Sequence, residues 1–165
     1  MVTLLVFVIM PGRVKFIQGN FFDLENDYFL VHQCNCVSTK GKGLSRNMSL
    51  IFPGANVFAS EQQRIPGTIF IKQRVVNMMV QVYPGRSKFP TDTVDIRLQF
   101  FKMCLKEITN HPIHKIAFPF RWGCGLAGSD WRKYLELIHH FAVNHPARQV
   151  VIVKAENQRK IYKCT

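Results

Sequence analysis

Val31-His32-Gln33-Cys34-Asn35-Cys36 ends an apolar segment, and Gly41-Lys42-Gly43-Leu44-Ser45 then opens a helix-like run. Glycines at such a point let backbone N–H groups approach an anion, and the start of a helix adds the positive end of its dipole. A side-chain amide can also bond the hydroxyl groups of a sugar. This stretch therefore predicts a pocket for a sugar that carries a diphosphate.

A second stretch has the same order of strand, glycine loop and helix. It reads Pro119-Phe120-Arg121-Trp122-Gly123-Cys124-Gly125-Leu126-Ala127-Gly128-Ser129-Asp130-Trp131. Two such loops at the ends of two buried strands can close on one ligand. We call residues 41–43 the first glycine loop and residues 123–128 the second, and we predict a single ligand site between them.

Composition limits the class of protein. The chain has 165 residues, of which 47% are hydrophobic, enough for one well-buried core and short for two. We therefore predict one domain over residues 1–165. The formal net charge of +12 favours anionic partners such as nucleotides or nucleic acid. The basic residues are scattered, which argues against a dedicated nucleic-acid face, and only the polar tail at residues 155–165 carries a basic patch.

The cysteine and histidine spacing predicts no metal. Five cysteines are an odd number, and Cys34 and Cys36 are too close for a zinc pair and lack a second pair. His111 and His114 have no further ligand nearby. We expect reduced thiols and a cytosolic or nuclear protein without a cofactor.

The apolar run at residues 2–10 is too short to span a membrane and lacks a basic flank. It fits either a weak signal segment or a β-hairpin. Pro11 and Gly12, followed by a strand-like run, favour the hairpin, with residues 1–12 as its N-terminal strand. We expect no membrane partner.

Periodicity predicts strands that alternate with helices, which indicates a mixed or mostly parallel sheet between helical layers. We expect strands at residues 13–17, 28–32, 68–72, 75–83, 115–118 and 149–153, and helices at residues 43–52, 55–64, 91–108 and 130–144. Their inward faces would carry Leu44, Met48 and Ile51; then Val94, Leu98, Phe101, Leu105 and Ile108; then Trp131, Tyr134, Leu135, Ile138 and Ala142. A basic loop rich in breakers lies at residues 83–90.

With these motifs in order, the chain resembles the macrodomain family, whose members are three-layer α/β/α modules that bind ADP-ribose. The resemblance covers nearly the whole chain. His-x-Cys-Asn-Cys at residues 32–36 and Gly-Cys-Gly-Leu-Ala-Gly-x-Asp-Trp at residues 123–131 are similar to the branch that includes ADP-ribose 1''-phosphate phosphatase and hydrolases that remove ADP-ribose from acidic side chains or DNA bases. It implies a central mixed, mostly parallel sheet.

The chain departs from the family pattern at four places. Asn20 stands where many macrodomains have Asp, and His32 stands in place of an Asn. Residues 83–85 contain no lysine, although Lys88 lies a few residues on, and Ala127 stands where some hydrolases carry a catalytic Asp. These departures argue against a lysine-adduct mechanism.

The resemblance implies a set of ligand contacts, most of them from the two glycine loops. The expected binding residues are Asn20, Phe21, Gly41, Lys42, Gly43, Leu44, Gly123, Cys124, Gly125, Leu126, Ala127 and Gly128. Arg86 and Lys88 in the basic loop either contact an extra terminal phosphate or form a solvated surface.

Three residues are candidates for catalysis. Asn35 is expected to position the distal ribose, the alternative being a turn residue. His32 is either a proton donor or a packed strand-end histidine. Asp130 is either a base that orients water or a helix N-cap. We treat Cys34, Cys36 and Cys124, which flank the site, as small packing residues.

The resulting hypothesis is a hydrolase of ADP-ribose derivatives, with ADP-ribose 1''-phosphate phosphatase or de-ADP-ribosylating activity. The alternative is a non-enzymatic reader of ADP-ribose or poly(ADP-ribose). Partners would be ADP-ribose derivatives and ADP-ribosylated protein or nucleic acid. A plain nucleic-acid-binding protein is a third class, which lacks a motif here.

Overall fold

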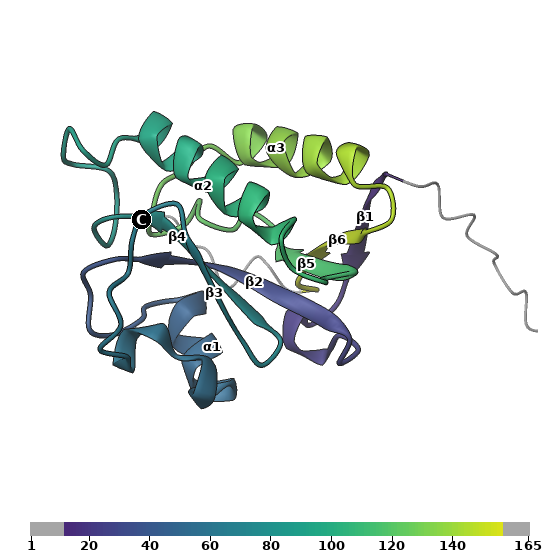
Figure 1. Ribbon diagram of the computed structural model, residues 1–165, viewed down its shortest axis with the longest axis horizontal. Helices are drawn as coiled ribbons and strands as arrows, with labels where there is room; N and C mark the ends of the chain where they lie inside the picture. Colours follow the sequence, from purple (N-terminus) through teal and green to yellow (C-terminus); the bar gives the residue numbers. More distant parts are fainter. Residues whose placement is uncertain (1–11, 157–165) are drawn as a thin grey trace, which may run out of the picture.

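The computed structural model describes residues 12–156 and shows strands that alternate with helices (Figure 1). The strands are β1 (Val14–Gln18), β2 (Tyr28–Asn35), β3 (Ile69–Lys72), β4 (Val75–Gln81), β5 (Lys115–Pro119) and β6 (Gln149–Lys154). The helices are α1 (Leu44–Ile51), α2 (Val94–Ile108) and α3 (Trp131–Asn144). The hairpin strand expected before Gly12 and the basic patch of the tail lie outside the described residues.

One six-stranded sheet joins these strands in the order β1-β6-β5-β2-β4-β3. Neighbouring strands run parallel, except for the antiparallel pair of β3 and β4. The predicted mixed, mostly parallel sheet is confirmed. Since β2 and β5 are adjacent and parallel, the loops that follow them leave the sheet at the same carboxyl edge.

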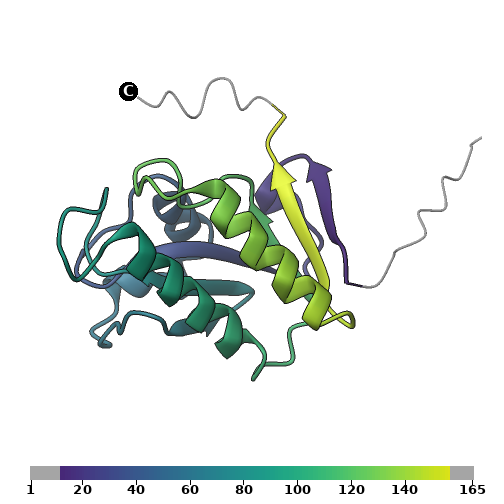
Figure 2. The same cartoon turned by 90° about the horizontal axis from the view of Figure 1, so that it is seen from above.

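Helices cover both faces of the sheet, which confirms the predicted three layers. Figure 1 shows α2 and α3 on one side of the sheet and α1 on the other, and Figure 2 shows α2 and α3 side by side. Alternate residues of β2 serve the two layers: Val31 packs with Phe101 of α2 and Ile138 of α3, whereas Leu30 packs with Met48 of α1. Parallel strands buried on both faces give the continuous apolar runs seen in the sequence.

The sequence prediction was wrong for residues 55–64, which form no α-helix. Two short 3-10 turns occur instead, Pro53–Ala55 and Val57–Ala59. The side chain of Asn56 accepts a hydrogen bond from the N–H of Phe58 and so starts a new turn rather than continuing the previous one. Val57 and Phe58 are then buried against the sheet.

Two predicted inward faces differ from the structure. Ile51 is 48% exposed at the end of α1, where Met48 and Ser45 are the buried residues. Val94 is 38% exposed at the start of α2, whereas Arg97, one turn later, is buried. Apolar periodicity did not indicate that a charged residue faces inward at this end of α2.

Candidate functional site

The two glycine loops lie side by side at the carboxyl edge of the sheet. The first follows β2 and leads into α1, and the second follows β5 and leads into α3. A Cβ placed on Gly43 would lie 3.7 Å from the Cδ1 atom of Leu126, so the tip of the second loop touches the first. The structure thus brings together the two loops that the sequence analysis placed around one ligand.

The second glycine loop presents backbone N–H groups that no other described residue uses. Gly128 N–H donates to the carbonyl of Gly125 (3.2 Å), and Ser129 N–H donates to that of Gly123 (3.1 Å), which folds the loop back on itself. Within residues 12–156, no hydrogen bond forms from the N–H groups of Gly125, Leu126 and Ala127. Unused donors on a tight turn are suited to an anion.

Gly123 needs to be glycine for two reasons. Its φ of 70° is left-handed, and a Cβ there would clash with the side chain of Gln33 and lie 3.0 Å from the ring of Tyr134. The second loop therefore packs directly on residues beneath it, and its backbone position is tightly set.

The first glycine loop ends in a helix start that no side chain caps. Gly43 is the N-cap of α1, with φ 57°, and it offers no side-chain acceptor. The opening N–H groups of a helix need partners, and they carry the positive end of its dipole. Lys42 is exposed and Leu44 is half-buried beside this helix start. Gly41 packs so closely on the backbone of Ser45 that a Cβ would lie 2.8 Å away.

A chain of buried and half-buried polar side chains lies beneath the second glycine loop. Tyr134 donates to the side-chain oxygen of Gln33 (3.2 Å), and Ser129 donates to Tyr134 (3.1 Å). Gln33 donates in turn to Gln81, whose amide donates to the carbonyl of Tyr83 (2.8 Å). Gln33 and Gln81 could not be predicted from the sequence, because polar residues in strands give no signal until their partners are known. Burial raises the pKa of Tyr134, so its hydroxyl stays protonated.

Comparison with known proteins identifies this architecture. No protein-family model matches the chain. The macrodomain of Mycobacterium tuberculosis DarG is similar over 86% of this chain and 97% of its own, with a TM-score of 0.65 and 20% identity. Thermosipho africanus DarTG in complex with ADP-ribose is similar over 92% of this chain and 44% of its own, with a TM-score of 0.61 and 16% identity. The chain has the macrodomain fold.

One curated relative gives a sequence match. An ADP-ribose 1''-phosphate phosphatase of Aspergillus oryzae is 35% identical over 54 residues, which make up 32% of this chain and 27% of that protein. The matched part spans about a quarter of the relative.

Asn35 lies at the end of β2, where the macrodomain fold opens toward the glycine loops. Its side-chain oxygen accepts hydrogen bonds from the N–H groups of Val37 (3.2 Å) and Ser38 (2.8 Å), as the turn alternative requires. Its amide nitrogen has no such bond within the described residues and can donate to a ligand. Asn35 therefore shapes the loop with one atom and leaves the other available.

His32 is enclosed between the sheet and α1. Its Nε2–H donates to the side-chain oxygen of Asn77 (2.5 Å), and its Nδ1 lies 3.2 Å from the hydroxyl of Ser45. Burial lowers the pKa of His32 to about 4, so the ring is neutral at neutral pH. With both nitrogens engaged and 2% of its surface exposed, His32 has the geometry of the packed alternative.

Asp130 and the β1 end have structural roles of their own. Asp130 is the N-cap of α3 and accepts a hydrogen bond from the N–H of Arg132 (3.0 Å), with its side chain 38% exposed.

Asn20 follows β1, and its side chain accepts a hydrogen bond from the N–H of Phe22 (3.1 Å), while Phe21 is buried in the core beneath α1. Asn20 reaches the same edge of the sheet as the loops, whereas the Phe21 side chain points away from solvent.

The basic loop at residues 83–90 touches the second glycine loop. A Cβ placed on Gly128 would lie 3.1 Å from Cγ of Arg86, so the stem of this arginine packs on the loop backbone. Lys88 is exposed, and Phe89 packs on Tyr83 with ring centroids 4.4 Å apart. The structure brings Arg86 to the site but shows no contact that draws Lys88 there.

The cysteines have the environment of packing residues. Burial raises the pKa of Cys34, and it raises that of Cys36 to about 11, so neither is a thiolate at neutral pH. Cys124 is half-buried and its thiol donates to the carbonyl of Trp122 (3.3 Å). In the part of the chain that the structure describes, no group of three His, Cys, Asp or Glu residues could hold a metal ion.

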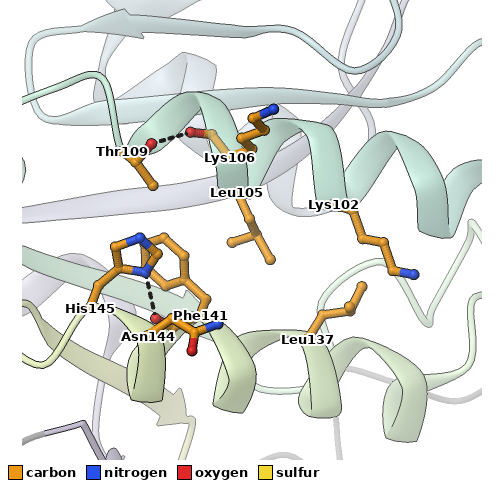
Figure 3. A pocket seen from close by; sticks show the side chains of 8 residues that line it. All are labelled: Lys102, Leu105, Lys106, Thr109, Leu137, Phe141, Asn144 and His145. Carbon is orange, nitrogen blue, oxygen red and sulfur yellow. Dashed lines mark hydrogen bonds between the residues drawn. The ribbon is translucent and has the colours of Figure 1, made fainter.

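A separate hollow of about 300 Å³ lies between the C-terminal halves of α2 and α3, on the outer side of the helical layer (Figure 3). Leu105, Leu137 and Phe141 provide apolar surface, and Lys102 and Lys106 stand beside them. Both helices begin at the carboxyl edge of the sheet and end at the other, so this hollow is at the opposite end from the glycine loops.

Over the described range, none of the helices is long and apolar enough to cross a membrane.

Proposed function

We propose that the protein binds ADP-ribose between its two glycine loops and hydrolyses an ADP-ribose derivative. The observation that carries the proposal is the side-by-side arrangement of an uncapped helix start at Gly43 and a loop with three unused N–H groups at residues 125–127. Both features favour a diphosphate. The solved Thermosipho africanus complex with ADP-ribose has the same fold, and the charge of +12 suits an anionic ligand.

The remaining parts of ADP-ribose have matching residues along the same edge. Asn20 at the end of β1 would contact the adenine, and the free amide nitrogen of Asn35 would donate to a hydroxyl of the distal ribose. Lys42, Leu44 and Cys124 would flank the diphosphate. Arg86, held on the second loop, and Lys88 would contact an extra phosphate on that ribose.

Hydrolysis would depend on positioning. Asn35 would hold the ribose so that water meets C1'' or its phosphate, and the loop N–H groups would stabilise the negative charge that develops. Asp130, partly exposed at the start of α3, would orient the water. The match to an ADP-ribose 1''-phosphate phosphatase makes ADP-ribose 1''-phosphate the first substrate to test; its products would be ADP-ribose and inorganic phosphate.

A non-enzymatic reader is the second candidate, and specific contacts favour it. The carboxylate of Asp130 caps a helix, and His32 is buried and neutral. The same glycine loops would bind ADP-ribose in either case. The two candidates differ only in whether a substrate is turned over.

Calorimetry with ADP-ribose tests the site. Gly125→Glu adds a carboxylate beside the expected diphosphate and should weaken binding about tenfold or more through charge repulsion. Gln99→Glu adds the same charge on an exposed position of α2 and should bind as the wild type does. Equal affinity of all three proteins would exclude the two loops as the ligand site.

Product analysis then separates enzyme from reader. The wild type is mixed with ADP-ribose 1''-phosphate, an ADP-ribosylated protein and O-acetyl-ADP-ribose. We expect turnover of at least one substrate, and Asn35→Ala should lower kcat about 100-fold with a smaller loss of affinity. Binding without turnover of any of them would establish the reader.

A further inference from the structure

Asp92 and Arg97 form a buried ion pair at the carboxyl edge of the sheet. Arg97 is 1% exposed and Asp92 is 0% exposed. Arg97 Nε donates to one carboxylate oxygen (3.0 Å) and Nη2 donates to the other (2.6 Å), so the contact is bidentate. Only an arginine can hold a carboxylate in this planar, two-pronged way.

The other N–H groups of Arg97 reach backbone carbonyls in two separate loops. Nη1 donates to Gly85 (2.8 Å) and Ala127 (3.2 Å), and Nη2 donates to Tyr83 (3.3 Å). Together with the bonds to Asp92, these contacts use all five donors of the guanidinium. Arg97 therefore hydrogen-bonds both the basic loop and the second glycine loop.

Asp92 holds the basic loop from its other side. Its two oxygens accept hydrogen bonds from the N–H groups of Val82 and Tyr83, each at 3.1 Å. The chain between Val82 and Asp92 thus forms a closed loop around the ion pair. Arg86 extends from this closed loop, and its stem packs on Gly128.

A buried ion pair is weak support for stability, because apolar residues of the same shape often serve as well. What distinguishes this ion pair is its geometry, because one planar guanidinium group hydrogen-bonds three backbone carbonyls that belong to two different loops. Ala127 O is bonded directly to Arg97, and Ala127 N–H is one of the unused donors proposed to face the diphosphate. A shift of Arg97 would therefore move the donors and Arg86 together.

We propose that Arg97 is a positioning residue that ties the basic loop to the second glycine loop, so that Arg86 and the N–H groups of residues 125–127 approach one ligand as a unit. This inference rests on the proposed function, because it assumes that ADP-ribose binds between the glycine loops. Arg97 itself is fully engaged and does not touch the ligand.

Hydrogen exchange followed by NMR tests the connection without any ligand. Arg97→Lys keeps the charge but can no longer reach both loops. We expect faster exchange of the amides of Tyr83 and Gly128, one in each loop, with unchanged protection of the β5 amides. Arg148→Lys, at the opposite edge of the sheet, is the matched control and should leave both loop amides unchanged. Faster exchange in only one loop, or in neither, would overturn the proposal.

Affinity measurements test the consequence for the site. Arg97→Lys should weaken ADP-ribose binding about tenfold or more, since misplaced donors lose their geometry. The effect of Arg86→Ala on binding of ADP-ribose 1''-phosphate should disappear in the Arg97→Lys background, as a double-mutant cycle measures. Additive losses would overturn the coupling between the loops.

The two failures are distinguishable. If the wild type binds no ADP-ribose, the proposed function fails, while the exchange data still report whether Arg97 connects the loops. If Arg97→Lys does not fold, Asp92→Asn replaces it; this variant keeps the shape but loses the charge, and the same two loop amides decide the outcome.

Discussion

Arginines hold loops at both edges of the sheet, but in different surroundings. At the carboxyl edge, Arg97 is buried, is paired with Asp92, and bonds the carbonyls of two loops. At the opposite edge, called the amino edge because the strands parallel to β2 begin there, Arg148 donates hydrogen bonds to the carbonyls of Thr109, His111 and Ile113. It has no ion pair among the described residues. Both guanidinium groups satisfy carbonyls that would otherwise lack donors.

The difference between the two edges follows from solvent. Arg148 is partly exposed, so water stabilises its charge, and it needs only the carbonyls. Arg97 is away from water, so its charge requires a carboxylate. The loops at the carboxyl edge are therefore fixed by an ion pair in which removal of either partner leaves a buried, unpaired charge. At the amino edge, water can replace the hydrogen bonds of Arg148.

The largest expected effect comes from removing each arginine in turn. Arg97→Met should lower the free energy of unfolding by about 3 to 5 kcal/mol, because Asp92 is left charged and buried without a partner. Arg148→Met removes hydrogen bonds whose carbonyls can turn to water, and should cost about 1 to 2 kcal/mol. Urea denaturation measures both values. Equal losses would mean that burial does not distinguish the two edges.

Acid sensitivity should distinguish the carboxyl half of β2 from the amino edge. The unfolded chain protonates His32 near pH 6.5, whereas burial lowers the pKa of the folded group to about 4. Its stabilising effect is complete above pH 6.5 and is lost as pH falls toward 4, which amounts to about 3 kcal/mol. At the amino edge, burial raises the pKa of Tyr28, and hydrogen bonds to Asp27 and Glu25 raise that of Lys115, so neither titrates in acid.

His32→Asn is the control for this pH dependence. An uncharged amide side chain does not titrate between pH 6.5 and 4. Denaturation at a series of pH values should give a flatter curve between pH 6.5 and 4 for the variant. The same slope in both proteins would assign the acid sensitivity to other groups.

The smallest effect should come from an exposed ion pair at the same edge as Arg97. Lys133 of α3 lies 3.3 Å from Asp95 of α2, with side chains 47% and 83% exposed. Water screens such a pair, so Lys133→Ala should change the free energy of unfolding by about 0.5 kcal/mol or less. A loss as large as that of Arg97→Met would show that charge, rather than burial, makes the carboxyl edge sensitive.

The sequence predicted the strands and long helices well because their apolar periods are strong. The runs at β4 and β6 are mostly apolar, and the middle of α2 keeps Phe101, Leu105 and Ile108 at helical spacing. Residues 55–64 were missed because Val57 and Phe58 are buried from 3-10 turns, and their spacing alone does not distinguish these from an α-helix.

The positions of the glycine loops could be predicted from sequence, but their supports could not. A glycine loop can be recognised from a few consecutive residues of the sequence. Gln33 and Tyr134 are 101 residues apart in the chain and meet only in the folded sheet, and Arg97 meets Ala127 across 30 residues. A polar residue that is buried by distant partners looks in sequence like one that faces water.

The position of β1 sets an order on folding. β1 lies at the edge of the sheet, and its neighbour in hydrogen bonding is β6, which comes last among the described strands. The ribosome therefore releases β1 about 130 residues before its partner exists, and pairing across such a separation closes slowly. Until then the side of β1 that pairs with β6 is open and able to join other chains. The pairing of β1 with β6 can therefore form only after β6 has been synthesised.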